Sequence, residues 1–253
     1  MGESRHNPDQ LLKATQADEE NRNKGHLKIF FGYAAGVGKT YAMLEAAHMA
    51  KQQGIDVVAG YIEPHSRPKT AALLNGLEVL PTSEVLYNGM ILNEFDIDMA
   101  LKRKPQLILV DELAHTNAEG CRHAKRYQDI KELLNAGIDV YTTVNVQHIE
   151  SLCDTVASIT EIVVRERIPD SIFDNADQVE LIDIEPQDLI NRLNTGNVYR
   201  QTQEKQAVEN FYTIENLTAL REISLRRCAD RVNILTENAR IKNHGDYHTD
   251  EHI

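Results

Sequence analysis

Residues 27–40, LKIFFGYAAGVGKT, decide the fold of this 253-residue chain. They begin as a compact apolar run rich in β-forming residues, pass through glycines and alanines, and open an amphipathic segment that Gly54 closes. This order predicts a strand, a loop and a helix. Glycines let backbone N–H groups in such a loop surround phosphates, a lysine reaches the phosphate oxygens, and a hydroxyl ligates magnesium. The predicted binding site for a nucleoside triphosphate, expected to be ATP with Mg²⁺, comprises Gly36, Val37, Gly38, Lys39 and Thr40.

The loop departs from the pattern G-x-x-x-x-G-K-[ST] at one position. Tyr33 fills the slot of the first glycine, and Gly32 lies one residue earlier. An ordinary glycine turn with a surface lysine is the alternative interpretation. We prefer phosphate binding because the loop follows a predicted strand and opens a predicted helix, which is the context that the chemistry requires.

An acidic pair supplies the second half of the predicted site. Residues 106–110, QLILV, read as a strand buried on both faces, and Asp111 and Glu112 follow at its C-terminal end. Asp111 is expected to hold Mg²⁺ together with Thr40, directly or through water, and Glu112 to activate a water molecule as a catalytic base. The alternative is that both are solvated turn residues. For Glu112 this alternative carries the same weight as catalysis, because the sequence does not place its side chain.

The remaining chain alternates strands with helix-length segments, which predicts a mostly parallel sheet with helices on both faces. The fold class is therefore α/β, similar to P-loop NTPases, with a C-terminal helical extension. The expected parts are an N-terminal tail and short helix at 1–26, the α/β domain at 27–200, the extension at 201–237 and a disordered tail at 238–253. Further expected strands are 55–61, 139–146, 162–164 and 179–184, and further expected helices are 67–74, 94–104, 122–135, 149–158 and 186–193. The extension should bury a stripe of Leu217, Leu220, Ile223, Val232 and Leu235.

Composition argues against several classes of protein. A formal net charge of −12 and a pI near 5.3 repel a phosphate backbone, so nucleic-acid binding is not expected. No apolar run reaches the ~18 residues that cross a bilayer, so direct membrane insertion is not expected either. The three cysteines lie far apart without a C-x-x-C pair, which favours a reducing cytoplasm over a disulfide framework.

Several strings outside the phosphate loop carry a family resemblance. They are VDELAHTN at 110–117, GYIE at 60–63, TAALL at 70–74, RYQD at 126–129, NVQHIE at 145–150 and PDS at 169–171. With these strings and the loop itself, the chain resembles the N-terminal cytoplasmic, ATP-binding sensor domain of the KdpD family of osmosensitive potassium-channel sensor histidine kinases. The resemblance runs from about Asn7 to Val232.

The resemblance implies a regulatory nucleotide-binding domain of a potassium- and turgor-sensing two-component system. It implies that Tyr41 joins the loop at the nucleotide, that His115 and Asn117 form a loop after the magnesium carboxylate, and that Asn145 and Gln147 end an adjacent strand near the γ-phosphate. The implied partners are the remaining membrane and kinase parts of such a sensor, or a separate sensor kinase chain, and the response regulator. Residues after 236 leave no room for a histidine kinase core, so we expect no such activity in this chain.

Two further hypotheses stay open beside the nucleotide-dependent switch. A stand-alone, slow P-loop ATPase would use Glu112 to activate water, and a non-catalytic interaction subunit would keep the fold and dock on other chains. Ala34 stands where related loops carry a lysine that reaches across a dimer, so ATP-driven dimerisation through that residue is not supported. Arg126 is interpreted either as an exposed helix arginine or as a charge that stabilises transferred phosphate. His65 and Arg67 either contact the nucleotide or lie in a solvated loop.

Overall fold

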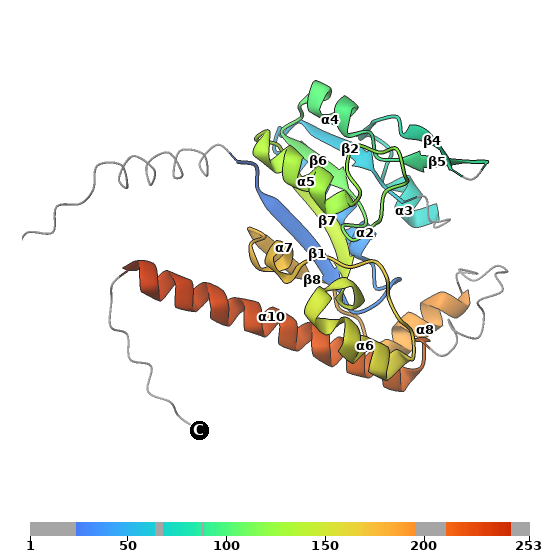
Figure 1. Ribbon diagram of the computed structural model, residues 1–253, viewed down its shortest axis with the longest axis vertical. Coiled ribbons are helices and arrows are strands. Elements are labelled where there is room, and N and C mark those ends of the chain that lie inside the picture. The colour runs from blue at the N-terminus through green and yellow to red at the C-terminus, as the bar shows by residue number, and fades with distance from the viewer. Residues whose placement is uncertain (1–23, 64–67, 88, 196–210, 244–253) are drawn as a thin grey trace, which may run out of the picture. The chain divides into compact units, whose positions relative to one another are not determined.

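The computed structural model describes residues 24–63, 68–87, 89–195 and 211–243. The short helix expected after Asn7, the loop residues His65 and Arg67, and the last ten residues of the chain lie outside the described parts. Six strands form one sheet in the order β3-β2-β6-β7-β1-β8 (Figure 1). Their bounds are β1 Leu27–Gly32, β2 Val57–Tyr61, β3 Glu78–Val79, β6 Leu107–Val110, β7 Asp139–Asn145 and β8 Gln178–Leu181.

The central strands confirm the predicted α/β class. β2 pairs in parallel with β3 and with β6, and β6 pairs in parallel with β7. Every residue of β2 and of β6 is buried, as expected for parallel strands covered on both faces. Gly60 of β2 is required by packing, because a Cβ there would lie 2.7 Å from the side chain of Ile108 on the neighbouring strand.

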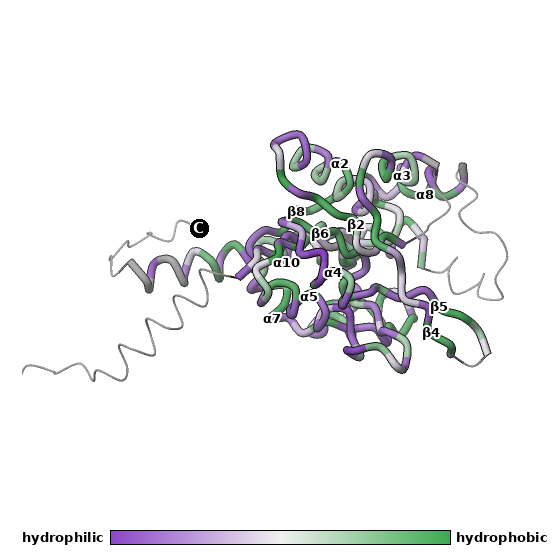
Figure 2. The backbone as a smooth tube through the Cα atoms, turned by 90° about the horizontal axis from the view of Figure 1, so that it is seen from above, coloured by the Kyte–Doolittle hydropathy of each residue, from purple (hydrophilic) through white to green (hydrophobic). Residues whose placement is uncertain are grey.

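Helices cover both faces of the sheet. Figure 2 shows α2 (Lys39–Gln52) and α3 (Pro68–Ala72) on one side of β2 and β6, and α4 (Ile97–Arg103) and α5 (Arg126–Asn135) on the other. Each of the two helices on the second side starts at a local hydrogen bond. The Asp96 carboxylate accepts from the N–H of Met99 at the start of α4, and the Gln128 side chain accepts from the N–H of Lys125 at the start of α5. No helix in the described part of the chain combines the length and apolarity needed to cross a membrane.

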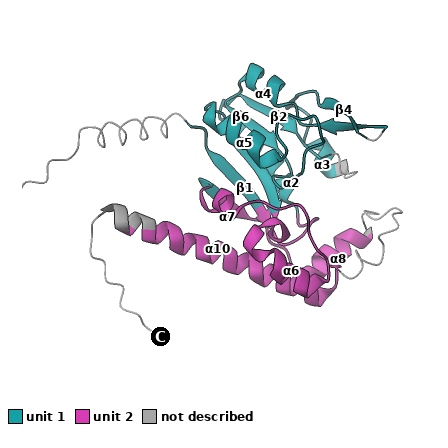
Figure 3. Ribbon diagram, viewed as in Figure 1, with its two compact units in different colours: residues 1–30, 38–144, 176–178 teal, residues 31–37, 145–175, 179–253 magenta. Residues whose placement is uncertain are grey.

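The chain divides into two compact units (Figure 3). Unit 1 comprises residues 1–30, 38–144 and 176–178, and unit 2 comprises 31–37, 145–175 and 179–253. The boundary passes through the predicted phosphate loop, between Val37 and Gly38. Unit 2 contains η1 Val146–His148, η2 Glu150–Leu152, α6 Cys153–Thr160, α7 Asp170–Asp174, α8 Pro186–Thr195 and α10 Ile214–Asn243, and α10 packs against α6, α8 and η1.

Several expected elements were wrong or missing. The run 162–164 is not a strand, because Val163 is exposed after the left-handed end of α6 and the isolated bridge of this region joins Ile149 to Ile168 instead. The helix expected at 149–158 is confirmed in part, because the 3₁₀ turn η2 is followed there by α6. The C-terminal helix α10 continues to Asn243, past the boundary expected at 237. The sequence analysis also missed α7, β3 and the antiparallel hairpin of β4 (Ser83–Tyr87) and β5 (Met90–Glu94). The sequence signal for the hairpin was Asn-Gly at 88–89 between two apolar runs.

The stripe expected on the C-terminal helix is only half buried. Leu217 and Leu220 are fully buried, but Val232 and Leu235 are 58% and 43% exposed. In the middle of the helix the buried positions are instead taken by Arg227 and Arg231. Arg227 donates to Asp174 at 2.6 Å, and Arg231 donates to the carbonyl of Phe173 at 3.2 Å, both at α7. Polar contacts to α7 therefore replace the apolar packing that the periodicity predicted.

Truncation of Leu220 in the first half of α10 should cost more stability than truncation of Val232 in its second half. We expect Leu220→Ala to lower the free energy of unfolding by ~2–4 kcal/mol, because it empties a fully buried site. Val232→Ala, the control on the same helix, should cost less than ~1 kcal/mol. Urea unfolding followed by circular dichroism measures both. Equal losses in the two variants would contradict the packing of this helix.

Candidate nucleotide site

The first part of the candidate site is the start of α2. Gly38 precedes the helix with a φ of 114°, and Gly36 has a φ of 100°, so both lie in the left-handed region that glycine tolerates best. Lys39 and Thr40 are the first two residues of α2, and Lys39 is buried. The N-terminus of a helix presents unpaired backbone N–H groups and the positive end of the helix dipole, which favour an anion. This part can therefore bind a phosphate group.

The carboxylate of Asp111 lies at the end of β6, within hydrogen-bond distance of α2. The Thr40 hydroxyl donates to its Oδ2 at 3.1 Å. Its Oδ1 accepts from the Thr143 hydroxyl on β7 and from the N–H of Glu112 at 3.1 Å. A hydroxyl and a carboxylate held together are hard oxygen donors of the kind that Mg²⁺ prefers, so these residues fit the expected metal ion. Within the described residues, no group of three or more His, Cys, Asp or Glu side chains adds a further metal site.

Glu112 sits in a strained and electrostatically unusual place. Its φ of 60° is rare for a residue with a side chain, and its N–H also donates to the Thr143 hydroxyl at 3.2 Å. Burial, followed by the negative charges of Asp111 and Glu63, raises the pKa of Glu112 to about 7. A carboxylate with such a pKa accepts a proton more readily than an ordinary surface glutamate does. The geometry therefore places the predicted catalytic base directly beside the predicted metal ligand.

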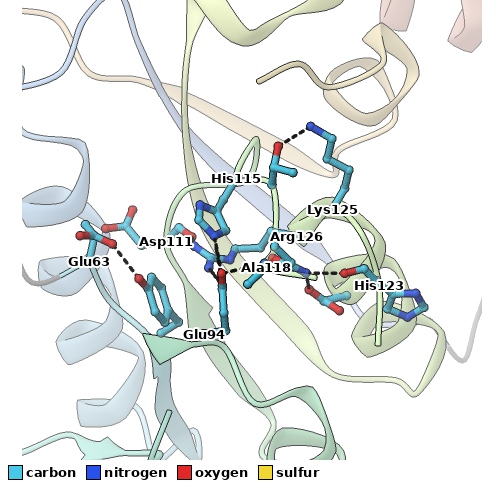
Figure 4. A network of polar contacts seen from close by, with 12 residues as sticks. Glu63, Glu94, Asp111, His115, Ala118, His123, Lys125 and Arg126 are labelled. Carbon is cyan, nitrogen blue, oxygen red and sulfur yellow. Dashed lines mark hydrogen bonds and ion pairs between the residues drawn. The ribbon is translucent and has the colours of Figure 1, made fainter. Parts of the chain in front are cut away.

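Arg126 corrects the view of an exposed helix arginine. It is fully buried and lies over the ring of Tyr61, with its guanidinium carbon 4.1 Å from the ring centroid. It donates to the main-chain carbonyl of Asp111 at 3.2 Å and to the Glu94 carboxylate at 3.1 Å (Figure 4). The Tyr61 hydroxyl donates to Glu63 at 2.7 Å. Sequence reasoning missed Glu94, Tyr61 and Glu63, because the first belongs to the missed hairpin and no local pattern joins the others to the acidic pair.

His115 and Asn117 direct their side chains to other protein groups. His115 Nε2 lies 3.0 Å from Glu94, and Figure 4 shows the two side chains pointing toward each other. The amide of Asn117 donates to the Asp129 carboxylate at 2.7 Å and to the carbonyl of His123 at 3.0 Å. These contacts hold the loop after Asp111 against α5 and the hairpin. A direct contact of either side chain with nucleotide stays a prediction.

The other predicted residues lie at the surface of α2 or in unit 2. Tyr41 is exposed and hydrogen-bonds to Glu45. Gly36 and Val37 belong to unit 2, as do Asn145 and Gln147. The side-chain oxygens Oδ1 of Asn145 and Oε1 of Gln147 are buried and have no hydrogen-bond partner among the described residues. Such atoms are costly to leave unpaired, which favours a role beyond packing.

In unit 2, C-terminal segments hold the first part of the loop. The residue in the slot of the first glycine, Tyr33, is buried and donates its hydroxyl to the carbonyl of Ile184 at 3.1 Å. Burial is the main cause that raises the pKa of Tyr33 to about 12. Tyr212 donates to the carbonyl of Ala35 at 3.3 Å. Tyr33 therefore anchors the loop through its side chain, which a glycine in that slot does not do.

The fold and the site define an α/β domain. Its candidate nucleotide- and metal-binding residues lie on a glycine loop, at a helix start and at an acidic strand end. Residues 23–232 match the family model of the osmosensitive K⁺ channel His kinase sensor domain, KdpD. This chain belongs to the KdpD sensor-domain family. It is 61% identical to the sensor protein KdpD of Clostridium acetobutylicum over 94% of this chain and 26% of that protein. It is 56% identical to the sensor protein KdpD of Escherichia coli K12 over 90% of this chain and 25% of that protein.

The chain thus spans about a quarter of the length of these two relatives. A putative sensor protein KdpD of Synechocystis is 47% identical over 94% of this chain and 65% of that protein. A solved DNA replication initiation factor aligns with 94% of this chain and 67% of its own at 12% identity and a TM-score of 0.35. A likeness of that size carries no functional argument.

The buried Asp129 should make stability depend on pH. Burial raises the pKa of Asp129 to about 6, and the hydrogen bond from Asn117 offsets this only in part. The folded state therefore binds this proton more tightly than the unfolded chain, whose aspartate pKa is about 3.9. The resulting stability is present below pH ~4 and is lost as the pH rises through 6.

The unfolding free energy of the wild type should fall as the pH rises from 4 to 7. We expect this fall to be ~2 kcal/mol smaller in Asp129→Asn, because asparagine has no proton to lose. Urea unfolding at several pH values measures the decrease. Asp230→Asn, at an exposed position of α10, should leave it unchanged. A wild-type pH dependence in the Asp129 variant would contradict the burial of an aspartic acid at this position.

Proposed function

We propose that this chain is the ATP-binding regulatory domain of a KdpD-type, potassium- and turgor-sensing two-component system. The observation that carries the proposal is the 3.1 Å hydrogen bond between the Thr40 hydroxyl and the Asp111 carboxylate, at the start of α2 and the end of β6. Family membership supports the signalling context, since the relatives are named sensor proteins KdpD. In this proposal the domain acts as a nucleotide-dependent switch.

Each residue of the switch has a physical role. Backbone N–H groups of residues 36–40 surround the β- and γ-phosphates, and the Lys39 ammonium neutralises their charge. Thr40 and Asp111 hold Mg²⁺, which when bound offsets phosphate charge and orients the triphosphate. Occupancy of the site reorganises the loops at 112–119 and 145–148. The first loop begins at the strained Glu112, and the second contains the oxygens of Asn145 and Gln147 that have no partner among the described residues.

The proposed partners come from the family resemblance, and the length of the relatives leaves room for them. Each of the two full sensor proteins is about four times as long as the segment matched here. As the family resemblance implies, the proposed partners are the remaining membrane and kinase parts of such a sensor, or a separate sensor kinase chain, and the response regulator. In that setting the domain works at the cytoplasmic face of the plasma membrane.

Lys39→Ala tests the assignment of the loop. Removing the ammonium should weaken Mg·ATP binding roughly a hundredfold, because charge-assisted hydrogen bonds to phosphate are lost. Isothermal titration calorimetry measures the dissociation constant. Lys131→Ala removes the same charge from an exposed position of α5 and should leave the affinity within about twofold of the wild type. Unaltered binding in the Lys39 variant would remove the loop from the proposal.

A second candidate function is a slow, stand-alone ATPase. The observation that favours it is the environment of Glu112, where burial and the charge of Asp111 raise the pKa to about 7. In this function the Glu112 carboxylate accepts a proton from a water molecule as that water attacks the γ-phosphorus and ADP leaves.

Glu112→Gln separates the two functions. If the chain is an ATPase, steady phosphate release should fall at least about a hundredfold in this variant, while the dissociation constant for Mg·ATP stays within a few-fold. A malachite-green assay beside calorimetry measures both quantities. Equal phosphate release in wild type and variant would exclude Glu112 as the base and leave the switch. Capture of a partner chain that does not depend on ATP would instead support a non-catalytic interaction subunit.

A further inference from the structure

The β4–β5 hairpin delivers one buried carboxylate to the acidic loop, residues 112–119, which follows Asp111. Glu94 is the last residue of β5, and its register partner across the hairpin is Ser83. Its side chain is 5% exposed, whereas Glu84, one position along the same ladder, is exposed. A buried carboxylate needs hydrogen-bond donors to offset the loss of water.

Three donors from the segment after β6 surround Glu94. His115 Nε2 lies 3.0 Å from its Oε2, the N–H of Ala118 donates to its Oε1 at 2.9 Å, and Arg126 donates to its Oε2 at 3.1 Å (Figure 4). Burial alone would raise the pKa of Glu94, but the hydrogen bonds from His115 and Ala118 hold it below its usual value. The carboxylate is therefore ionised and joins three points that span twelve residues of the chain.

Arg126 extends this connection to the predicted metal ligand. The guanidinium that donates to Glu94 also donates to the main-chain carbonyl of Asp111 at 3.2 Å. The main chain continues the same path, because the N–H of Arg126 donates to the carbonyl of His115, and the N–H of His115 donates to the carbonyl of Glu112. The side chain of Asp111 is held separately, by Thr40 and Thr143. Asp111 is thus fixed by its carboxylate on one side and by its carbonyl on the other.

We propose that Glu94 is a positioning residue for Asp111. Through Arg126, His115 and Ala118 it holds the main chain at the end of β6 where the Asp111 carboxylate, together with Thr40, receives Mg²⁺. This inference rests on the proposed function, because it concerns the metal ion that accompanies ATP. The hairpin, which lies outside the predicted phosphate loop, thereby affects how much Mg²⁺ strengthens the binding of ATP.

The quantity that tests this role is the magnesium gain, defined as the ratio of the ATP dissociation constant in EDTA to that in excess Mg²⁺. The phosphate loop acts in both conditions, whereas Asp111 acts only through the metal. A variant that merely loosened the domain would weaken ATP binding in both conditions. A variant that displaces Asp111 should lower the gain and leave binding in EDTA unchanged.

Glu94→Gln in the complete chain removes the charge at nearly constant volume. We expect its magnesium gain to fall about tenfold, the usual effect of losing a group that orients a metal ligand, with the dissociation constant in EDTA within about twofold of the wild type. Glu84→Gln removes the same charge from an exposed position of the same hairpin and should keep the wild-type gain. Calorimetric titrations with ATP, under both conditions, measure each value.

Arg126→Lys supplies an independent variant if Glu94→Gln does not fold. A lysine keeps the positive charge beside Glu94 but cannot reach Glu94 and the Asp111 carbonyl at once, so the gain should fall here too. A wild-type gain in either folded variant would overturn the role of Glu94. If the wild-type protein itself binds ATP without any magnesium gain, or does not bind ATP, the proposed function fails first and this inference fails with it.

Discussion

The carboxylate of Asp111 is the constraint on which the candidate site depends. It joins three elements that are distant in sequence, since it ends β6, accepts from Thr143 on β7 and accepts from Thr40 at the start of α2. Because β6 and β7 are paired in parallel, the C-terminal ends of the two strands meet at one edge of the sheet. The buried run of β6 thus delivers an acidic residue to the place where the predicted phosphate loop opens into its helix.

The charges around this carboxylate show why several negative groups can lie close together here and which groups offset their repulsion. Asp111, Glu112 and Glu63 form a negative cluster, and burial of Glu112 beside it raises the pKa of that residue. Arg126 is the buried cation that partly offsets the cluster, and Glu94 in turn fixes Arg126. A bound Mg²⁺ would offset the same negative charge. Binding of a cation together with the triphosphate would therefore reduce the repulsion within this cluster. The same change in charge would act on the loops that carry these residues.

Local sequence patterns predicted the part of the structure that local interactions determine. The strand, loop and helix at 27–52 follow from an apolar run, glycines and an amphipathic segment, and the end of β6 follows from four apolar residues before Asp111. The parallel α/β class follows from the alternation of such segments. The long-range contacts were beyond these patterns. Arg126 was interpreted either as an exposed helix arginine or as a charge near transferred phosphate, because helix periodicity does not show that Glu94, 32 residues earlier, pairs with it in the interior.

Two misses had different causes. The hairpin of β4 and β5 was signalled by Asn-Gly at 88–89, a turn pair that local reasoning can use, and the hairpin carries the residue that organises the acidic loop. The middle of α10 gave no such signal. Arg227 and Arg231 are buried there only because α7 supplies Asp174 and the carbonyl of Phe173, which lie more than fifty residues away.

A structure with Mg²⁺ and a non-hydrolysable ATP analogue tests the central claim most directly. The account predicts that the phosphates lie against residues 36–40 and that Mg²⁺ lies between the Thr40 hydroxyl and the Asp111 carboxylate. Coordination would then replace the 3.1 Å hydrogen bond that joins these groups here. A nucleotide bound elsewhere, or bound at the loop with that hydrogen bond intact and the metal ion away from both residues, would contradict it.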